Sequence, residues 1–176
     1  MITTIEIYTF SIRRKRAHSP ISFSDEPDIF NLLVDDQNGF VPFIDKCATG
    51  DLPAEKMSIR IPKGKHHRNI DERFLCGIIE TGHYGKEYEA VDKDNPKDDT
   101  KKIVLGKSKA ILKPFFYFIK IPRNGNKALL ILERTENDGI YPVLRSIFIS
   151  FFNMRLNFGF DEDETCEYTI DRYNFI

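Results

Sequence analysis

KPFFYFIKIPRNGNKALLILERT, residues 113–135, carries the strongest fold signal in the chain. Two apolar runs of strand length lie on either side of the turn sequence RNGN, residues 123–126. Asn-Gly is among the strongest short-range hairpin signals, because a type I′ turn requires positive φ at both central residues. We therefore predict an antiparallel hairpin that pairs Phe115–Ile121 with Ala128–Glu133. Both runs are almost continuously hydrophobic, which predicts that neighbouring elements cover both faces of the hairpin.

An amphipathic helix is predicted after this hairpin, over about residues 141–156. Pro142 falls in its first turn, where proline is tolerated. Apolar residues at helical spacing form one broad face, and Arg145, Asn153 and Arg155 lie on the remaining side. The apolar face consists of Val143, Leu144, Ile147, Phe148, Phe151, Phe152 and Met154.

The N-terminal residues predict a strand and then a short helix. Thr3–Ile12 is rich in β-branched and aromatic residues, and its apolar residues share one face if the register changes near Thr9. The short helix is predicted in residues 24–36, with Ser24 or Asp25 as its N-cap and Pro27 in its first turn. The apolar residues of the strand are Ile5, Ile7, Phe10 and Ile12, and those of the helix are Ile29, Phe30, Leu33 and Val34.

The middle of the chain predicts more strands. Residues 57–62 and 73–82 have strand character, and residues 83–92 are expected to pair with the second of these through a turn at 83–85. Residues 92–102 contain no apolar residue and include the turn signal Asn95-Pro96, so they predict a loop. Residues 166–176 predict a last strand. Together these elements predict an α+β fold: a mostly antiparallel sheet, one long C-terminal helix (about 141–156) packed on it, and a short N-terminal helix.

Length and composition predict one globular domain spanning residues 1–176. A chain of 176 residues can bury a core of its own, and 41% hydrophobic with 12% aromatic residues excludes a disordered chain. The apolar end of the chain leaves two alternatives: a terminal strand, or the N-terminal domain of a longer protein. The net charge of −1 gives no overall signal for nucleic-acid binding.

Cysteine usage and the N-terminal sequence predict a cytoplasmic protein without a membrane partner. Cys47, Cys76 and Cys166 form no CxxC or CxxH pattern, so they do not support a zinc site and suit a reducing cytosol. The first basic residues follow an apolar stretch, which is the reverse of a signal peptide. Arg145 and Arg155 interrupt the longest apolar run, which is therefore too polar for a membrane span.

No strong catalytic motif occurs in the sequence. Walker A, GxGxxG, GxSxG, HExxH and EF-hand patterns are absent, and the GKS triplet at residues 106–108 lacks the upstream glycine of a phosphate loop. The carboxylate-lysine pattern of PD-(D/E)xK nucleases also fails, because no lysine stands two residues after Glu80. We therefore expect no catalytic residues, no cofactor and no metal.

KGKHHRNIDER, residues 63–73, leaves three alternatives: a metal or catalytic site, a nucleic-acid contact, or a solvated loop. His66 and His67 are adjacent, so they point in opposite directions on a strand and diverge by about 100° on a helix. Chelation of one metal ion by both is therefore awkward. His83 with Asp71 or Glu80 could complete a site, but nothing in the spacing requires it. This favours the loop and the phosphate contact over the metal.

Basic residues gather in three blocks. Residues 13–16 read RRKR, residues 56–73 hold six basic residues against two acidic ones, and residues 101–127 hold eight basic residues and no acidic one. A fold that gathers these blocks on one face would bind phosphates in a salt-dependent way, whereas the alternative is a solvated surface. The candidate nucleic-acid-binding residues are Arg13, Arg14, Lys15, Arg16, Lys63, Lys65, His66, His67, Arg68, Lys107 and Lys109.

Two segments stand out together with the helix that follows them: IIETGHYGKEYEAVD (78–92) and KPFFYFIKIPRNGNKALLILERTENDGI (113–140). In this combination the chain resembles uncharacterised bacterial proteins of mobile elements and phage-defence islands. The resemblance covers Arg73 to Phe152 and consists of core and turn positions, so it transfers no active site. It implies a prokaryotic source and a role in defence against phage.

These observations lead to three hypotheses. The first is a non-catalytic module that binds nucleic acid or a larger protein subunit, acting as a sensor or adaptor in a bacterial anti-phage defence system. The second is a small metal-dependent nuclease or other hydrolase that uses the histidines and nearby carboxylates. The third is an assembly subunit that docks onto a larger complex.

Overall fold

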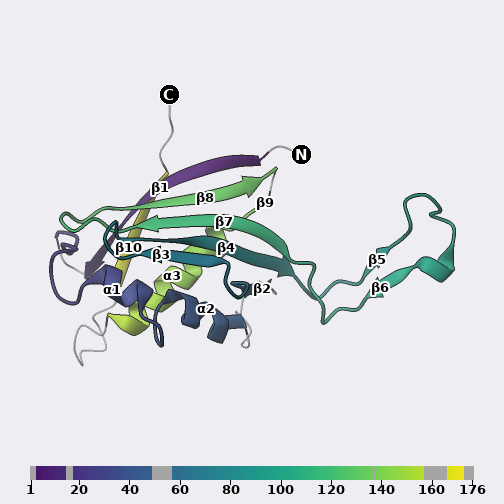
Figure 1. Ribbon diagram of the computed structural model, residues 1–176, viewed down its shortest axis with the longest axis horizontal. Coiled ribbons are helices and arrows are strands. Elements are labelled where there is room, and N and C mark those ends of the chain that lie inside the picture. Colours follow the sequence, from purple (N-terminus) through teal and green to yellow (C-terminus); the bar gives the residue numbers. More distant parts are fainter. Residues whose placement is uncertain (1–2, 15–17, 49–56, 137, 157–165, 173–176) are drawn as a thin grey trace.

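An antiparallel sheet forms the framework of the protein, which confirms the α+β class. The computed structural model describes residues 3–14, 18–48, 57–136, 138–156 and 166–172, with the backbone alone for Arg14, Ala48, Lys101 and 166–172. The strands of the main sheet are β1 (Thr3–Arg14), β2 (Met57–Arg60), β3 (His66–Asn69), β4 (Phe74–His83), β7 (Lys113–Lys120), β8 (Ala128–Thr135), β9 (Asp138–Gly139) and β10 (Cys166–Arg172). Their order is β10-β1-β8-β7-β4-β2, while β3 also pairs with β4 and β9 with β8 (Figure 1).

Within the described residues, three α-helices pack on one face of this sheet: α1 (Ile29–Val34), α2 (Phe40–Ala48) and α3 (Tyr141–Arg155). They lie together, below the strands in the view of Figure 1. α3 occupies the predicted position, but its 15 residues make only about four turns and β10 follows it. The predicted long C-terminal helix is therefore not found.

The predicted hairpin is confirmed as β7 and β8, which pair from Tyr117 with Leu132 to Lys120 with Leu129. Its turn is wider than predicted. Gly125 has a φ of 98°, but Asn124 is not among the described residues with positive φ, so the turn is not the two-residue type I′. The backbone N–H of Phe23 donates to the Gly125 carbonyl at 2.7 Å, so the N-terminal loop packs on the tip of the hairpin.

β1 is a regular strand, and the predicted change of register near Thr9 is wrong. Its side chains alternate, and the inward ones are buried along the strand. Glu6 takes a place in the core that the sequence pattern did not indicate. Its carboxylate accepts hydrogen bonds from the Tyr8 hydroxyl at 2.7 Å and the Arg134 guanidinium at 3.1 Å, while Ile5 is exposed. The inward set is Glu6, Tyr8, Phe10 and Ile12.

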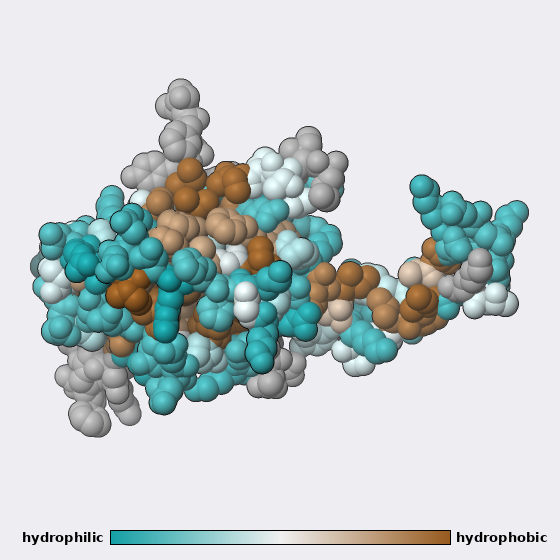
Figure 2. All heavy atoms as spheres, viewed as in Figure 1, coloured by the Kyte–Doolittle hydropathy of each residue, from teal (hydrophilic) through white to brown (hydrophobic). Residues whose placement is uncertain are grey.

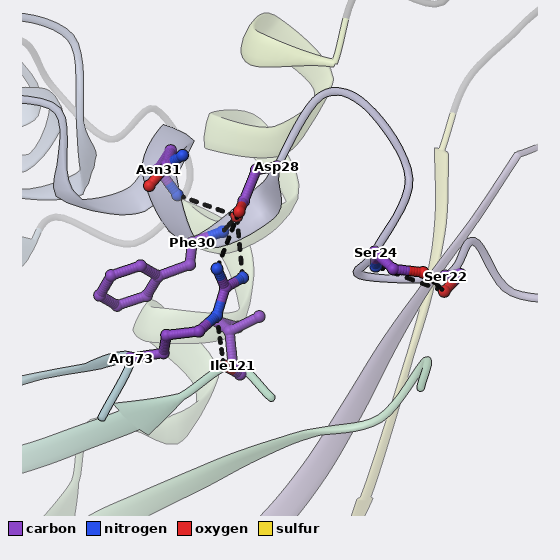
Figure 3. Close-up of polar contacts among 7 residues, drawn as sticks. All are labelled: Ser22, Ser24, Asp28, Phe30, Asn31, Arg73 and Ile121. Carbon is purple, nitrogen blue, oxygen red and sulfur yellow. Dashed lines mark hydrogen bonds and ion pairs between the residues drawn. The ribbon is translucent and has the colours of Figure 1, made fainter. Parts of the chain in front are cut away.

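α1 begins at a cap that was predicted at the wrong residue. Asp28, not Ser24 or Asp25, accepts hydrogen bonds from the backbone N–H groups of Phe30 and Asn31, and Pro27 precedes the helix. The same carboxylate accepts hydrogen bonds from both terminal nitrogens of the Arg73 guanidinium, each at 2.8 Å (Figure 3). Asp28 thus caps the helix and also ties it to the start of β4.

α2 was not predicted, although it supplies the centre of the core. The ring of Phe40, at its first residue, stacks on Phe148 with centroids 4.8 Å apart and meets Phe151 edge-on. It also contacts the ring of Tyr117 from β7. This aromatic group joins two helices to the sheet.

Tyr117 carries a buried hydroxyl that finds no hydrogen-bond partner among the described residues. Its side chain is fully buried, and burial raises the pKa of the phenol. We expect Tyr117→Phe to raise the free energy of unfolding by about 1 kcal/mol, because it removes an unpaired buried group and leaves the ring in place. Urea denaturation monitored by circular dichroism measures the change.

Tyr8→Phe is the matched control, because the Tyr8 hydroxyl donates to Glu6. We expect this variant to lower the free energy of unfolding by about 1 kcal/mol, because a buried carboxylate oxygen then lacks its hydrogen-bond donor. A loss of stability in Tyr117→Phe of the same size as in Tyr8→Phe would contradict the prediction.

Candidate functional site

The face of the sheet that points away from the helices is apolar and half-buried. On β7 and β8, inward side chains are fully buried, whereas Phe116, Phe118, Leu129 and Ile131 alternate with them and retain some exposure. In the part of the chain that the structure describes, no helix packs on this outer face. The prediction that neighbours cover both faces of the hairpin is therefore met fully on one face and only in part on the other.

Strand register aligns the outer side chains into a band across the sheet. Cys76 of β4 pairs with Phe118, Phe118 with Ile131 of β8, and Ile131 with Ile7 of β1. The ring of Phe74 stacks on Phe118 with centroids 5.2 Å apart. Burial raises the pKa of the Cys76 thiol, so this residue stays neutral within the band. The outer face of the sheet thus carries a continuous, partly exposed apolar band.

A projecting arm, residues 84–112, leaves the sheet between β4 and β7. Its strands β5 (Tyr88–Ala90) and β6 (Ile103–Leu105) form a separate antiparallel pair, and a short 3-10 turn, Asp99–Lys101, lies between them. Figure 1 shows the arm extending well away from the sheet and helices. The expected pairing of residues 83–92 with β4 is therefore wrong, because β5 pairs with β6 instead.

The root of the arm is closed by tight backbone contacts. The N–H of Gly85 donates to the Lys107 carbonyl at 2.7 Å. At Gly82, an added Cβ would lie 2.1 Å from the carbonyl oxygen of Ile111, a distance that no side chain tolerates. Glycine at this position therefore lets the chain that returns from the arm pass directly beside β4.

The arm exposes more apolar side chains than any other part of the described chain. It carries four of the seven large apolar residues that are exposed there, with exposed fractions from 48% to 62%. Figure 2 shows hydrophobic residues along the arm, near its root and around its two strands. Ile103 and Val104 are neighbours on β6, so they point to opposite faces of the ribbon and both faces are apolar. The four residues are Val91, Ile103, Val104 and Ile111.

The KGKHHRNIDER stretch is largely exposed, as a solvated segment would be, but residues 66–69 form the strand β3, which pairs with β4. β3 pairs His66 with Gly77 and His67 with Cys76. As expected for strand neighbours, the two histidines diverge: His66 borders a hollow beside α1, and His67 lies near the ring of Phe74 on the outer face. They therefore do not share a site.

Arg68 is engaged within the protein. Its guanidinium donates to the Val34 carbonyl at 2.5 Å and to both carboxylate oxygens of Asp36, at 2.6 and 3.1 Å. This contact holds the pKa of Asp36 below its usual value and joins the end of α1 to β3. A phosphate would have to displace an existing partner at this residue.

The other candidate basic residues lie at separate places. Lys63 and Lys65 are exposed beside the middle of β4, where the Lys65 carbonyl accepts from Ile78. Lys107 and Lys109 are exposed at the root of the arm. Arg13 and the backbone of Arg14 end β1, which is three strands away from β4, or about 14 Å at the usual strand spacing. Because Phe10 pairs with Ala128, the end of β1 lies near the tip of the β7–β8 hairpin, where the third block ends. Lys15 and Arg16 lie outside the described residues.

The described residues contain neither a metal-binding cluster nor a membrane-spanning helix. Among the described residues, no group of three His, Cys, Asp or Glu side chains could hold a metal ion. No helix in the described ranges is long and apolar enough to cross a membrane. No family model, curated protein or solved structure matches the chain significantly.

Neither the arm nor the open sheet face was predicted from the sequence. The short apolar runs around residues 88–91 and 103–105 flank a polar stretch with an Asn-Pro turn, which is the pattern of a separate hairpin. That signal was present but was assigned to pairing with β4. The open face had no signal of its own, because a strand with two apolar faces has the same sequence whatever covers the second face.

Proposed function

We propose that this chain is a binding module without catalytic activity of its own, and that its arm docks onto a protein partner in a bacterial anti-phage defence system. The observation that carries the proposal is the arm itself, an isolated ribbon with apolar side chains on both faces. The resemblance to mobile-element and phage-defence proteins supplies the biological setting. The free Cys47 and Cys76 suit action in the cytoplasm.

The size of the arm argues that it needs a partner. β5 and β6 have three residues each, and a two-stranded ribbon is at best marginally stable in water. The exposed Ile103 and Val104 side chains are not buried against the main sheet or the helices, so the body of the protein does not stabilise them. A partner that encloses both faces of the ribbon would bury these side chains and hold the strands together.

The charges of the arm favour protein over nucleic acid. Residues 84–112 contain seven lysines and six acidic residues, so the arm is nearly neutral. Lys102 also pairs with Glu89 at 2.7 Å. A nucleic-acid contact would require an excess of cations along the surface. The partner that fits is a protein with an apolar groove bordered by charges of both signs.

Paired arm variants test this proposal. Ile103→Lys/Val104→Lys places charge on both faces of the ribbon, whereas Lys107→Glu/Lys109→Glu reverses charge at its root. The tagged full chain and both variants are used to capture proteins from the native host. A protein that the unaltered chain captures and Ile103→Lys/Val104→Lys does not is then purified. Calorimetry should show that Ile103→Lys/Val104→Lys weakens its binding about 30-fold or more, as expected when apolar anchors are lost. Lys107→Glu/Lys109→Glu should bind nearly as the unaltered chain does.

Two outcomes would contradict the arm as the docking element. One is unchanged capture and affinity in Ile103→Lys/Val104→Lys. The other is binding of DNA or RNA, followed by fluorescence anisotropy, that Lys107→Glu/Lys109→Glu or Lys63→Glu/Lys65→Glu abolishes; this would favour the nucleic-acid alternative. Sedimentation of the unaltered chain that shows a dimer, lost in the apolar variant, would assign the partner to a second copy.

A further inference from the structure

A pocket of about 420 Å³ lies at the root of the arm, between the inward face of the sheet and the first turn of α3. This volume is within the range of small-molecule sites. Its wall is mostly apolar and includes Met57, Ile111, Phe115 and Val143. Phe115 and Val143 are almost completely buried, so the pocket is a continuation of the core that opens toward the arm.

The inner wall of the pocket holds a polar atom without a partner. Thr81 is only 5% exposed, and its hydroxyl makes no hydrogen bond to any residue that the structure describes. A buried hydroxyl in this state carries a desolvation penalty, so it requires an explanation such as a ligand or an ordered water. Because Thr81 lines the pocket, a polar atom of a bound molecule can supply the missing hydrogen bond.

The rim of the pocket carries one cation and one anion side by side. The ammonium of Lys113 pairs with the carboxylate of Asp138, and this hydrogen bond raises the pKa of Lys113. Both side chains are more than half exposed. An exposed ion pair of this kind is weak, so its partners can reorient toward a ligand at little cost.

The N-terminus of α3 adds a second site of positive potential at the rim. The helix begins beside Gly139, Pro142 and Val143, which line the pocket. No described side chain caps this end, and its first turn contains no acidic residue. The helix dipole and the free N–H groups of a first turn favour a carboxylate at such a position.

We propose that this pocket binds a zwitterionic α-amino acid with a large side chain. The carboxylate of the ligand lies at Lys113 and the N-terminus of α3, and its ammonium lies at Asp138. The apolar body of the side chain occupies the space beside Phe115 and Val143, and a polar atom at its end pairs with the Thr81 hydroxyl. The pocket shares Tyr88 and Ile111 with the arm but includes neither Ile103 nor Val104, so the proposal goes beyond the proposed function.

The charge pattern of the rim favours a zwitterion over a ligand of one sign. A ligand with only a carboxylate is attracted by Lys113 but repelled by Asp138. A ligand with only an ammonium is attracted by Asp138 but repelled by Lys113 and by the positive end of α3. The apolar wall excludes a ligand without a large side chain, because such a ligand leaves the pocket unfilled. The Thr81 hydroxyl predicts a preference for tyrosine over phenylalanine.

Calorimetric and NMR titrations of the full chain with five probes test the site. L-Tyrosine and L-phenylalanine carry both charges and an aromatic body, 3-phenylpropionate lacks the ammonium, phenethylamine lacks the carboxylate, and glycine lacks the body. We expect L-tyrosine to bind most tightly, L-phenylalanine about tenfold more weakly, and the other three more weakly still. The amide signals of Thr81, His83 and Val143 should shift on binding.

Two variants separate the roles of the polar groups. Thr81→Val is nearly isosteric, so it should keep the fold and abolish the preference for tyrosine over phenylalanine. Lys113→Gln should weaken the binding of both amino acids about tenfold, and it should not weaken the binding of phenethylamine. Comparison of all five probes within each variant serves as the internal control, because a general loss of folding would weaken every probe alike.

Each result decides the proposal. Absence of binding by all five probes up to millimolar concentration would overturn the site. Equal binding of 3-phenylpropionate and L-phenylalanine would overturn the zwitterion, and an unchanged preference for tyrosine in Thr81→Val would overturn the role of the hydroxyl. Because the arm residues Ile103 and Val104 do not line the pocket, their variants should bind the probes normally, so failure of the docking proposal is distinguishable from failure of this one.

Discussion

Asp28→Ala is expected to lower the free energy of unfolding by about 3–5 kcal/mol, because it leaves the buried Arg73 guanidinium without its counter-charge. Arg73 is 8% exposed, and both of its terminal nitrogens donate to the Asp28 carboxylate at 2.8 Å. Its Nε donates to the Ile121 carbonyl, and the guanidinium lies over the Phe30 ring, so the cation cannot easily move into solvent. The variant also loses the N-cap of α1, which contributes about 1 kcal/mol. Urea denaturation measures the loss.

A double-mutant cycle separates the ion pair from the cap. Asp28→Asn keeps a good N-cap but removes the charge, and Arg73→Met removes the cation and keeps much of the volume. We expect the double variant Asp28→Asn/Arg73→Met to be more stable than the sum of the single losses predicts, because it leaves no unpaired buried charge. Strict additivity of the two single losses would contradict the coupling.

The pH dependence of this ion pair follows from the direction of the pKa shift. Hydrogen bonding from Arg73 is the largest cause that holds the pKa of Asp28 below its ordinary value of 3.8, and burial opposes it. A carboxyl with a lowered folded-state pKa stabilises the protein above its unfolded-state pKa, and this contribution is lost as the pH falls through the folded-state pKa. The stability difference between the unaltered chain and Asp28→Asn should therefore be largest at about pH 7 and shrink below about pH 4. A difference that grows with acidity would contradict this sign.

Phe40→Ala is expected to lower the free energy of unfolding by about 3–5 kcal/mol. The ring is fully buried, and it contacts Phe148, Phe151 and Tyr117. Its removal opens a cavity where α2, α3 and β7 meet, and the stacked rings around it cannot collapse without shifting a helix. Chemical denaturation and the thermal midpoint should both report the loss.

Phe118→Ala is the matched control on the opposite face of the sheet. Its ring is half-buried and stacks on Phe74, on the face where the described chain places no helix. Neighbouring side chains and water can fill the space, so we expect a loss well below that of Phe40→Ala. Equal losses would mean that α2 contributes little to the core.

The elements that were located correctly are those whose signals are local. The hairpin of residues 113–135 carries its own turn and two strand-length apolar runs, and the apolar face of α3 repeats at helical spacing. α2 was missed because its nine residues are short and contain Pro42 in place of a clear start signal. The Asp28 cap was misplaced because Ser24, Asp25 and Asp28 all suit an N-cap, and the additional contact of Asp28 with Arg73 has no signal in the local sequence.

The candidate surfaces depended on which strands become neighbours. Register across β4, β7, β8 and β1 aligned Cys76, Phe118, Ile131 and Ile7, which are far apart in the sequence. The same strand order kept Arg13 apart from Lys63 and Lys65, although composition alone suggested a common face. The pocket likewise combines Thr81, Lys113 and Asp138 from three separate elements.

Local sequence was thus enough to define the α+β class, the central hairpin and the position of α3, because hydrophobic periodicity and turn chemistry act over a few neighbouring residues. The folded chain alone established that the arm pairs with itself and that one face of the described sheet stays without a helix. Strand pairing and burial depend on contacts between residues distant in the chain, and a local pattern does not specify which partner is chosen.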